Sequence, residues 1–173
     1  MTVQLAARRA VVVLAAATLL SACQVSRSPI TTANQVDLNR FMGRWYVIAC
    51  IPTFIERDAY NAVEAYELAK DGSIETTFTF NQGAFDGPVR RYQPRGFVRD
   101  RTSNAVWGMQ FVWPIKADYR IVHVSGDYRQ TIVGREARDH VWIMARSPTI
   151  PGEEYAALLA IVEREGYDMS ELR

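Results

Sequence analysis

Four side chains in this sequence are of types that do covalent or acid-base chemistry: Cys50, His123, His140 and Asp118. A thiol with a histidine base is suited to nucleophilic catalysis. No close spacing joins the four, and Cys50 alternates out of phase with its apolar neighbours, so we expect it to lie on the outer face of its strand. We therefore expect a packing thiol and no enzyme activity. Two distant histidines make no zinc site, so we also expect no metal and no cofactor.

The other cysteine, Cys23, ends an apolar N-terminal stretch. Two arginines precede the uncharged run from Ala10 to Leu20, which is shorter than the ~20 residues that span a bilayer, so residues 1–22 are interpreted as an export signal. The run Leu20-Ser21-Ala22-Cys23 resembles the lipobox of bacterial lipoproteins, in which the cysteine is acylated and becomes the mature N-terminus. By resemblance to enteric sorting rules, Gln24 favours the outer membrane on its periplasmic side. A soluble periplasmic protein remains the alternative.

Composition limits the partners of the exported chain. Of the 173 residues, 49% are hydrophobic, and 20 basic residues stand against 19 acidic ones. Removal of residues 1–22 takes two arginines and leaves 18 basic residues, a net charge near −1. A near-neutral domain binds polyanions poorly, so we expect no nucleic acid partner. Residues 23–36 are rich in Ser, Thr and Asn and are expected to be a flexible tether to a single domain at 37–173.

The elements that must position any site are mostly strands. After Gly43, segments rich in aromatic and β-branched residues recur between turn signals, as is typical of all-β proteins. Within them Ile74, Thr76, Phe78 and Phe80 alternate with polar residues, which indicates one buried face. Eight sequential antiparallel strands suit an up-and-down barrel, with a two-sheet sandwich as the alternative. The expected strands are 44–52, 61–69, 73–80, 90–99, 104–113, 117–124, 128–134 and 140–146.

One long helix is expected near the C-terminus. Pro151 suits its first position, and Gly166 suits a C-terminal stop. Apolar residues fall at helical spacing on a single stripe, which we expect to pack against the outside of the barrel. The stripe consists of Tyr155, Leu158, Leu159 and Val162.

Three short motifs fall in the order that the lipocalin family has them. Gly43-Arg44-Trp45 opens the first expected strand and resembles the family's G-x-W motif. Asp127-Tyr128 resembles the second motif, and Arg146, at the end of the eighth strand, resembles the third. Together with the lipobox and the C-terminal helix, these motifs make the chain similar to the bacterial outer-membrane lipocalins. The resemblance implies an eight-stranded barrel in which Gly43, Trp45 and Arg146 form a structural lock, with the guanidinium over the indole ring.

A barrel of eight strands leaves room for one small ligand. Glu64 is expected on the inner side of the second strand, against an arginine, a tyrosine hydroxyl or a polar ligand head. A shift of one residue would instead place Glu64 in water and Val63 and Ala65 inside. The loop around Phe54 to Arg57 is expected to frame the open mouth and either to gate entry, touch a membrane or simply pack on itself. The expected lining is Val47, Ala49, Ile51, Glu64, Tyr66, Phe78, Phe80, Trp107, Met109 and Phe111.

The family resemblance and the apolar lining point to the same function. Bacterial lipocalins resemble carriers of fatty acids and lysophospholipids, so the sequence favours a lipid-anchored protein that binds such ligands in the cell envelope, for envelope maintenance or lipid storage. Two alternatives stay open. The barrel interior could be filled by side chains, which would make this a structural envelope protein, or a lipocalin-like enzyme could use the four reactive residues. The oligomeric state stays open as well.

Overall fold

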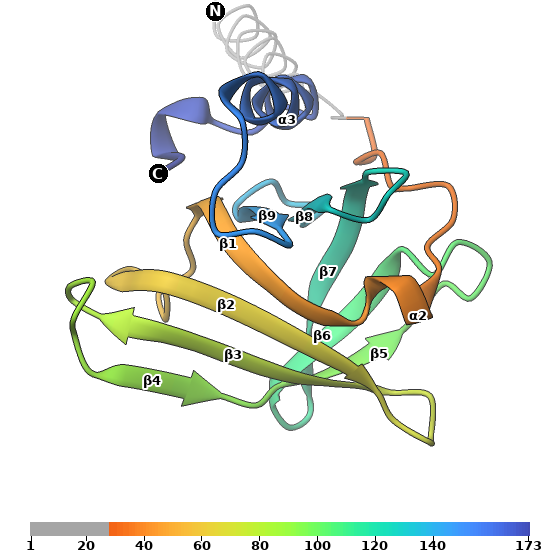
Figure 1. The fold of residues 1–173 in the computed structure, drawn as a ribbon. Coiled ribbons are helices and arrows are strands. Elements are labelled where there is room, and N and C mark those ends of the chain that lie inside the picture. Colours follow the sequence, from red (N-terminus) through yellow and green to blue (C-terminus); the bar gives the residue numbers. More distant parts are fainter. Residues whose placement is uncertain (1–27) are drawn as a thin grey trace, which may run out of the picture.

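The computed structural model describes residues 28–173, and its strands form one antiparallel sheet that closes on itself (Figure 1). The spatial order is β2-β1-β9-β8-β7-β6-β5-β3-β4, and a further pairing of β2 with β3 closes the barrel. Closure leaves no sandwich of two separate sheets. The strands are β1 (Gly43–Ile51), β2 (Ala59–Leu68), β3 (Ile74–Gln82), β4 (Val89–Tyr92), β5 (Arg95–Val98), β6 (Val106–Val112), β7 (Ile115–Val124), β8 (Gln130–Gly134) and β9 (Val141–Ala145).

The predicted eight-stranded barrel is confirmed, although its fourth strand is interrupted. β4 and β5 pair one after the other with β3, so they are two halves of one barrel strand. The break falls at Gln93-Pro94, where proline has no N–H to donate to the ladder. The carbonyl of Pro94 still accepts from the Thr76 N–H at 3.1 Å, which keeps the two halves in line.

A β-bulge in β1 changes which side chains face the interior. Val47 pairs with Met144, but Ala49 pairs with Ile143, so one residue of β1 is extra. An extra residue reverses the alternation beyond it. The expected inward orientation of Ala49 and Ile51 is therefore wrong: both belong to the outer apolar cluster beneath the C-terminal helix. Cys50, expected outside, packs against the inner cluster instead.

The closed end of the barrel is sealed by a short helix and an arginine. Helix α2 (Leu38–Phe41) is capped by the Asp37 carboxylate and lies beside Trp45, whose indole N–H donates to the Phe41 carbonyl at 2.8 Å. The guanidinium of Arg146 lies over the Trp45 ring, with 3.7 Å from Cζ to the ring centroid. It also donates to five backbone carbonyls, those of residues 40, 41, 42, 44 and 128.

Gly43 belongs to the same closed end. Its φ of +93° is strained for any residue with a Cβ, and an added Cβ would lie 3.3 Å from an Arg146 guanidinium nitrogen. The three motif residues therefore meet in space as the family resemblance implies. We refer to this contact as the Trp45–Arg146 lock.

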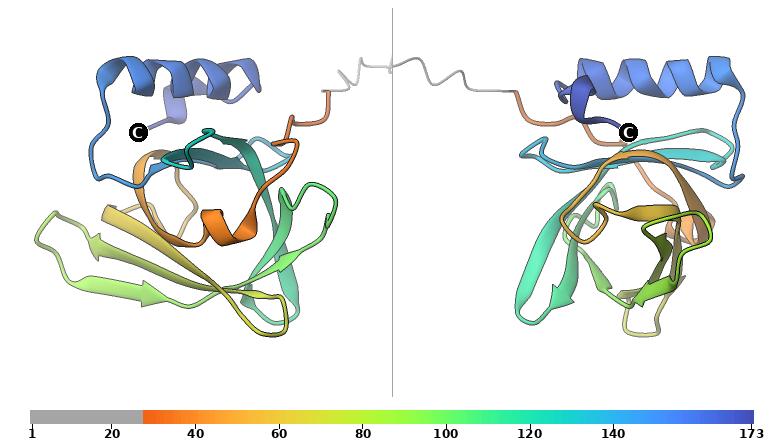
Figure 2. Two further views of the ribbon diagram at one scale, coloured as in Figure 1. Left: turned by 45° about the vertical axis from the view of Figure 1, so that its right-hand side comes forward. Right: turned by 90° about the vertical axis from the view of Figure 1, so that its left-hand side faces the viewer.

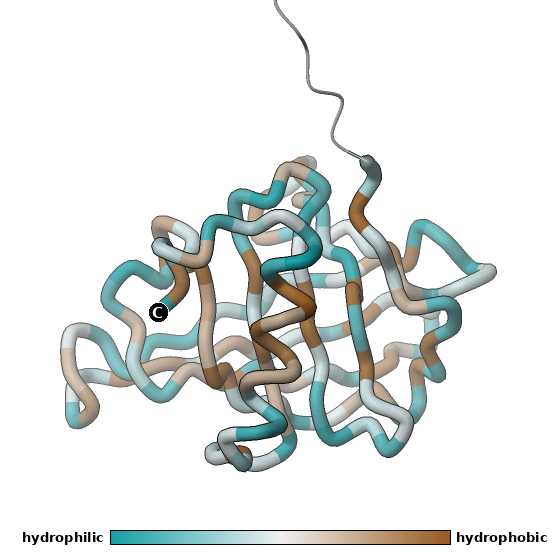
Figure 3. The backbone as a smooth tube through the Cα atoms, turned by 90° about the horizontal axis from the view of Figure 1, so that it is seen from above, coloured by the Kyte–Doolittle hydropathy of each residue, from teal (hydrophilic) through white to brown (hydrophobic). Residues whose placement is uncertain are grey.

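Helix α3 (Gly152–Arg164) lies across the outside of the barrel, as Figure 2 shows from two sides. Seen from above, hydrophobic and hydrophilic stretches alternate along its turns over the strands (Figure 3). Leu158 and Val162 are buried against the outer cluster, which includes Ile132 and Ile143 of β8 and β9. Because both faces of β9 are covered, all five of its residues are buried. After α3, the short 3-10 helix η1 (Met169–Glu171) precedes the last residues.

Residues 28–36 run along the outside of the barrel, and we call them the N-terminal strap. Ile30 and Val36 are buried. The Ala33 N–H donates to the Ile121 carbonyl at 2.9 Å, and the Val36 N–H donates to the Ser103 carbonyl at 2.7 Å. The expected flexible tether is therefore wrong for residues 30–36, which pack on the domain. The predicted signal 1–22 and Cys23 lie outside the described residues. Within 28–173, no helix has the length and apolar character needed to cross a membrane.

Candidate ligand-binding cavity

The half of the barrel next to α2 is filled with aromatic side chains. Phe41 contacts the rings of Trp45, Tyr66 and Trp107 at centroid distances of 5.1, 5.8 and 5.5 Å. Trp107 stacks on Tyr119 at 5.3 Å. Aromatic contacts of this kind add to the stability gained by burial. These packed rings form the floor of the space in the other half of the barrel, and we call them the cavity floor.

The half of the barrel near the mouth encloses a cavity of about 300 Å³. Strands β2, β3, β6, β7 and β9 supply its walls, and the loop between β1 and β2 covers part of its opening. The wall is mainly apolar and aromatic, the usual composition of a small-molecule pocket. Its residues are Thr53, Phe54, Ile55, Glu56, Glu64, Thr76, Phe78, Pro94, Met109, Phe111, Val112, Ala117, Asp118, Tyr119, Arg135, His140 and Trp142.

Glu64 sits at the bottom of this cavity in a chain of hydrogen bonds. The Tyr66 hydroxyl donates to Glu64 Oε2 and lies 2.6 Å from the Tyr119 hydroxyl. Burial, together with the nearby charge of Glu56, raises the pKa of Glu64 to about 8. Burial and the charge of Glu64 also hold the pKa of Tyr119 well above its usual value. At neutral pH the floor is therefore polar but uncharged, which an apolar ligand tolerates better than a carboxylate.

A second buried carboxylate, Glu56, comes from the loop between β1 and β2. Its Oε1 accepts from the indole N–H of Trp142 at 2.7 Å. Its Oε2 accepts from the backbone N–H and the hydroxyl of Thr53 at 2.9 and 2.7 Å. Arg173 holds the same loop from outside, because its guanidinium donates to the carbonyls of Glu56 and Arg57. The loop is thus fixed over the cavity at both of its faces.

The wall nearest the β8–β9 loop carries unused hydrogen-bonding atoms. Nε of Arg135 and Nδ1 of His140 are buried, and neither makes a hydrogen bond within residues 28–173. Asp118 is engaged elsewhere, because it pairs with Arg120 at 2.9 Å. Buried polar groups are normally satisfied, so these two nitrogens are exceptions beside the cavity.

The four residues with reactive side chains do not assemble into a catalytic site. His140 and Asp118 line the cavity, but His123 lies on the outer side of β7, where burial and the nearby charge of Arg164 lower its pKa. Burial and the nearby Glu56 raise the pKa of Cys50 to about 11. A protonated thiol is a poor nucleophile, so the environment of Cys50 works against activation. Within residues 28–173, no cluster of three potential metal ligands is found.

The expected lining residues separate into three groups. Glu64, Phe78, Met109 and Phe111 lie on the cavity wall. Tyr66, Trp107 and Val47 face inward but belong to the packed floor, while Phe80 is buried beside the wall, between Phe78 and Tyr92. Ala49 and Ile51, as noted, are on the outside.

Sequence reasoning missed Tyr119, Trp142 and Arg135 as wall residues. Tyr119 alternates with Ala117 and Ile121, so period-two spacing could have found it. Trp142 gave no such signal, because its neighbours Val141 and Ile143 are equally apolar. Only the burial of both faces of β9 explains that run.

Comparison with known proteins shows the family to which this chain belongs. A family model described as "Lipocalin-like domain" matches residues 36–173. The chain belongs to the lipocalin family. It is 30% identical to the outer membrane lipoprotein Blc of Escherichia coli (strain K12), over 90% of this chain and 88% of that protein. It is 31% identical to the outer membrane lipoprotein Blc of Citrobacter freundii, over 91% and 89%. The temperature-induced lipocalin-1 of Arabidopsis thaliana is 28% identical, over 79% and 77%.

Solved structures agree on the fold of this lipocalin. The cockroach allergen Per a 4 superposes with a TM-score of 0.63 at 16% identity, covering 83% of this chain and 89% of the allergen. Insecticyanin from the tobacco hornworm Manduca sexta gives a TM-score of 0.63 at 16% identity, covering 84% and 83%. At such identities the likeness concerns the barrel and not its ligand.

Proposed function

We propose that this lipocalin binds fatty acids or lysophospholipids, taken tail first, at the periplasmic side of the outer membrane, to which an acylated Cys23 anchors it. Envelope maintenance or lipid storage is the process that such a carrier would serve. The observation that carries the proposal is the enclosed apolar cavity over an uncharged floor. Support for the anchor comes from the lipobox and from relatives whose names are outer membrane lipoprotein Blc.

The volume of the cavity favours one acyl chain. A methylene takes about as much space as a water molecule in the liquid, roughly 30 Å³. The 300 Å³ space therefore corresponds to about ten methylenes. Their burial gains about 8 kcal/mol gross at ~0.8 kcal/mol each. Association costs remove part of that gain, so an affinity near micromolar is expected.

The position of the polar groups favours an anionic head at the mouth. Arg135 and His140 flank the β8–β9 loop and line the cavity. The Arg135 guanidinium already pairs with the Asp139 carboxylate at 3.2 Å, and its Nε has no hydrogen bond within residues 28–173. Glu64 lies deeper, at the level where Trp45 pairs with it across the sheet. A carboxylate or phosphate at the mouth would meet a guanidinium, whereas at the floor it would meet an acid.

A cavity-filling substitution tests the proposal. Purified residues 24–173 are denatured and extracted, and mass spectrometry identifies lipid that co-purified; a fluorescent fatty acid then gives the affinity. Ala117→Trp places a large ring on the cavity wall and is expected to weaken binding by about tenfold or more. The matched control is Ala65→Trp on the outer surface of β2, which should leave binding unchanged.

Two results would contradict the carrier. An extract free of lipid, from a protein that also fails to bind the fluorescent fatty acid, favours a structural role for a filled barrel. Equal loss of binding in the Ala117 and Ala65 variants, with both folded by circular dichroism, would show that the probe does not report the cavity.

A further inference from the structure

Large apolar side chains project into solvent around the mouth of the barrel. Phe54 is in the β1–β2 loop and Trp113 is at the tip of the β6–β7 hairpin; each is 82% exposed. Val112 and Ile115 flank Trp113, and Phe85 is exposed at the tip of the β3–β4 hairpin. The Gly83 N–H donates to the Asp58 carbonyl at 2.7 Å, which ties that hairpin to the β1–β2 loop. We call Phe54, Phe85, Val112, Trp113 and Ile115 the apolar rim. Exposed clusters of this kind usually mark an interaction site.

The charges beside the apolar rim are predominantly basic. Residues 52–58, 83–92 and 111–116 expose four cationic side chains, those of Arg57, Arg90, Arg91 and Lys116, against two acidic ones, Asp58 and Asp86. Exposed aromatic rings surrounded by cations are the composition that favours the boundary between lipid headgroups and acyl chains.

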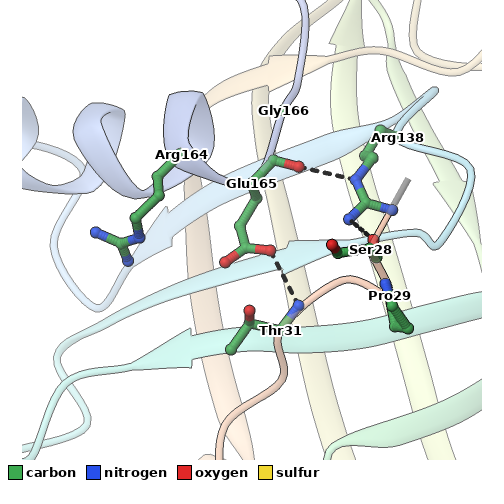
Figure 4. Close-up of a pocket in the computed structure, with 7 residues that line it drawn as sticks. All are labelled: Ser28, Pro29, Thr31, Arg138, Arg164, Glu165 and Gly166. Carbon is green, nitrogen blue, oxygen red and sulfur yellow. Dashed lines mark hydrogen bonds between the residues drawn. The ribbon is translucent and has the colours of Figure 1, made fainter. Parts of the chain in front are cut away.

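The N-terminal strap begins at the same end of the barrel as the apolar rim. Figure 4 shows Arg138 of the β8–β9 loop donating to the Ser28 carbonyl, at 2.7 Å, and Glu165 accepting from the Thr31 N–H, at 2.9 Å. Arg138 is itself fixed, because it also donates to the carbonyls of Glu165 and Glu136. The strap then runs toward the closed end.

The length of chain before the strap limits how far the mouth can stand from an anchor. Ser28 is five positions after Cys23, and an extended chain spans at most ~3.6 Å per position. An acylated Cys23 in a bilayer would therefore hold the β8–β9 loop within about 18 Å of the lipid surface. A strap that began at the closed end would leave the mouth free to point into water, whereas this strap begins beside the β8–β9 loop at the mouth.

We propose that the apolar rim docks into the surface of a phospholipid bilayer, so that an acyl chain passes between membrane and cavity without crossing water. The inference rests on the proposed function and adds its route of loading. Trp113 and Ile115 are the principal insertion residues, because they are exposed and lie outside the cavity wall.

Intrinsic fluorescence gives a specific test. The chain has four tryptophans, and Trp45, Trp107 and Trp142 are buried, so Trp113 is the one open to a quencher in solution or in lipid. The experiment uses residues 24–173, which lack the acylated cysteine and retain both apolar clusters, built from residues 30–172. Vesicles of phosphatidylethanolamine and phosphatidylglycerol with doxyl labels near the headgroup end of the acyl chains should quench Trp113. Trp113→Phe should remove most of that quenching while vesicle binding persists, and only quenching of Trp142 by a chain that enters the cavity should remain.

The rim is then removed without touching the cavity wall. Trp113→Ser combined with Ile115→Ser should weaken vesicle binding by about tenfold or more, while the affinity for a fluorescent fatty acid added from solution stays unchanged. Leu68→Ser, at an exposed leucine of the opposite end, is the matched control and should bind vesicles like the wild type.

The outcomes separate this inference from the proposed function. Fatty acid binding without any lipid quenching of Trp113, or a double variant that binds vesicles as tightly as the wild type, overturns membrane docking and leaves the carrier intact. Self-association that buries Trp113 and excludes vesicles overturns docking in favour of a second copy of the chain. Failure of every variant, and of the wild type, to bind the fatty acid would overturn the carrier itself.

Discussion

Replacement of Glu64 by glutamine tests the electrostatics of the cavity floor. Burial and the nearby charge of Glu56 raise the pKa of Glu64 from 4.5 to about 8. The folded protein then keeps this proton up to about pH 8, whereas the unfolded chain releases it near pH 4.5. The stability that the proton confers is fully present below pH 4.5 and is lost as the pH rises to 8.

The expected change in stability follows from the difference between the pKa of Glu64 in the folded protein and in the unfolded chain. Each pH unit between the two pKa values costs the folded state about 1.4 kcal/mol, so wild-type stability should fall by about 4 kcal/mol between pH 5 and pH 8 through this group. Glu64→Gln is neutral throughout and still accepts from Tyr66. Its stability relative to wild type should therefore rise by about the same amount over that range.

Urea unfolding at each pH measures the difference directly. The depressed pKa of His123 acts in the opposite direction but is common to both proteins and cancels in the comparison. Glu67→Gln, on the exposed face of the same strand, is the matched control and should track the wild type. A Glu64→Gln difference that stays constant within about 1 kcal/mol from pH 5 to pH 8 would refute the assignment. Identical pH profiles of fatty acid affinity in the two proteins would remove Glu64 from the ligand site.

Three further substitutions test how the barrel and its loops are held. Arg146→Ala removes the cation over Trp45 and leaves five backbone carbonyls without this donor. The midpoint of thermal unfolding should fall by about 5–15 °C, a loss of roughly 2–4 kcal/mol, while ligand affinity stays unchanged. A selective loss of binding would contradict a structural lock. Gly134→Ala would drive a Cβ into the hydroxyl of Tyr167 and should cost about 1–3 kcal/mol in urea unfolding; an unaffected midpoint would show that Tyr167 moves freely. Arg173→Ala should speed amide hydrogen exchange in residues 52–58 by about tenfold, while the free energy of unfolding changes by less than about 1 kcal/mol. An unchanged exchange rate would mean that other contacts hold the loop.

Much of the fold is determined by local patterns that the sequence carries openly. The alternation of Ile74, Thr76, Phe78 and Phe80 places all four inside, because side chains on a strand point to alternate faces. The stripe of α3 and its stop before Gly166 follow from helical spacing in the same way. Motifs spread over 100 residues indicated the Trp45–Arg146 lock by resemblance.

The inward face of β1 beyond Val47 and the path of residues 30–36 were decided only by the tertiary structure. One extra residue between Val47 and Ala49, set by the pairing of β1 with β9, reversed the orientation of Cys50 and Ile51, and nothing in the local sequence marks it. The strap became ordered because Ile30 and Val36 find apolar surface that is distant in the sequence.

The properties of Glu64 also depend partly on the sequence and partly on the tertiary structure. The sequence supplied Glu64 and its strand, but its raised pKa depends on a carboxylate from another loop and on the aromatic rings that exclude water. Alternation is a local property of the backbone and can be read from neighbours in the chain. Desolvation, strand register and loop position each depend on contacts between residues far apart in the sequence, and these contacts form only when the barrel closes.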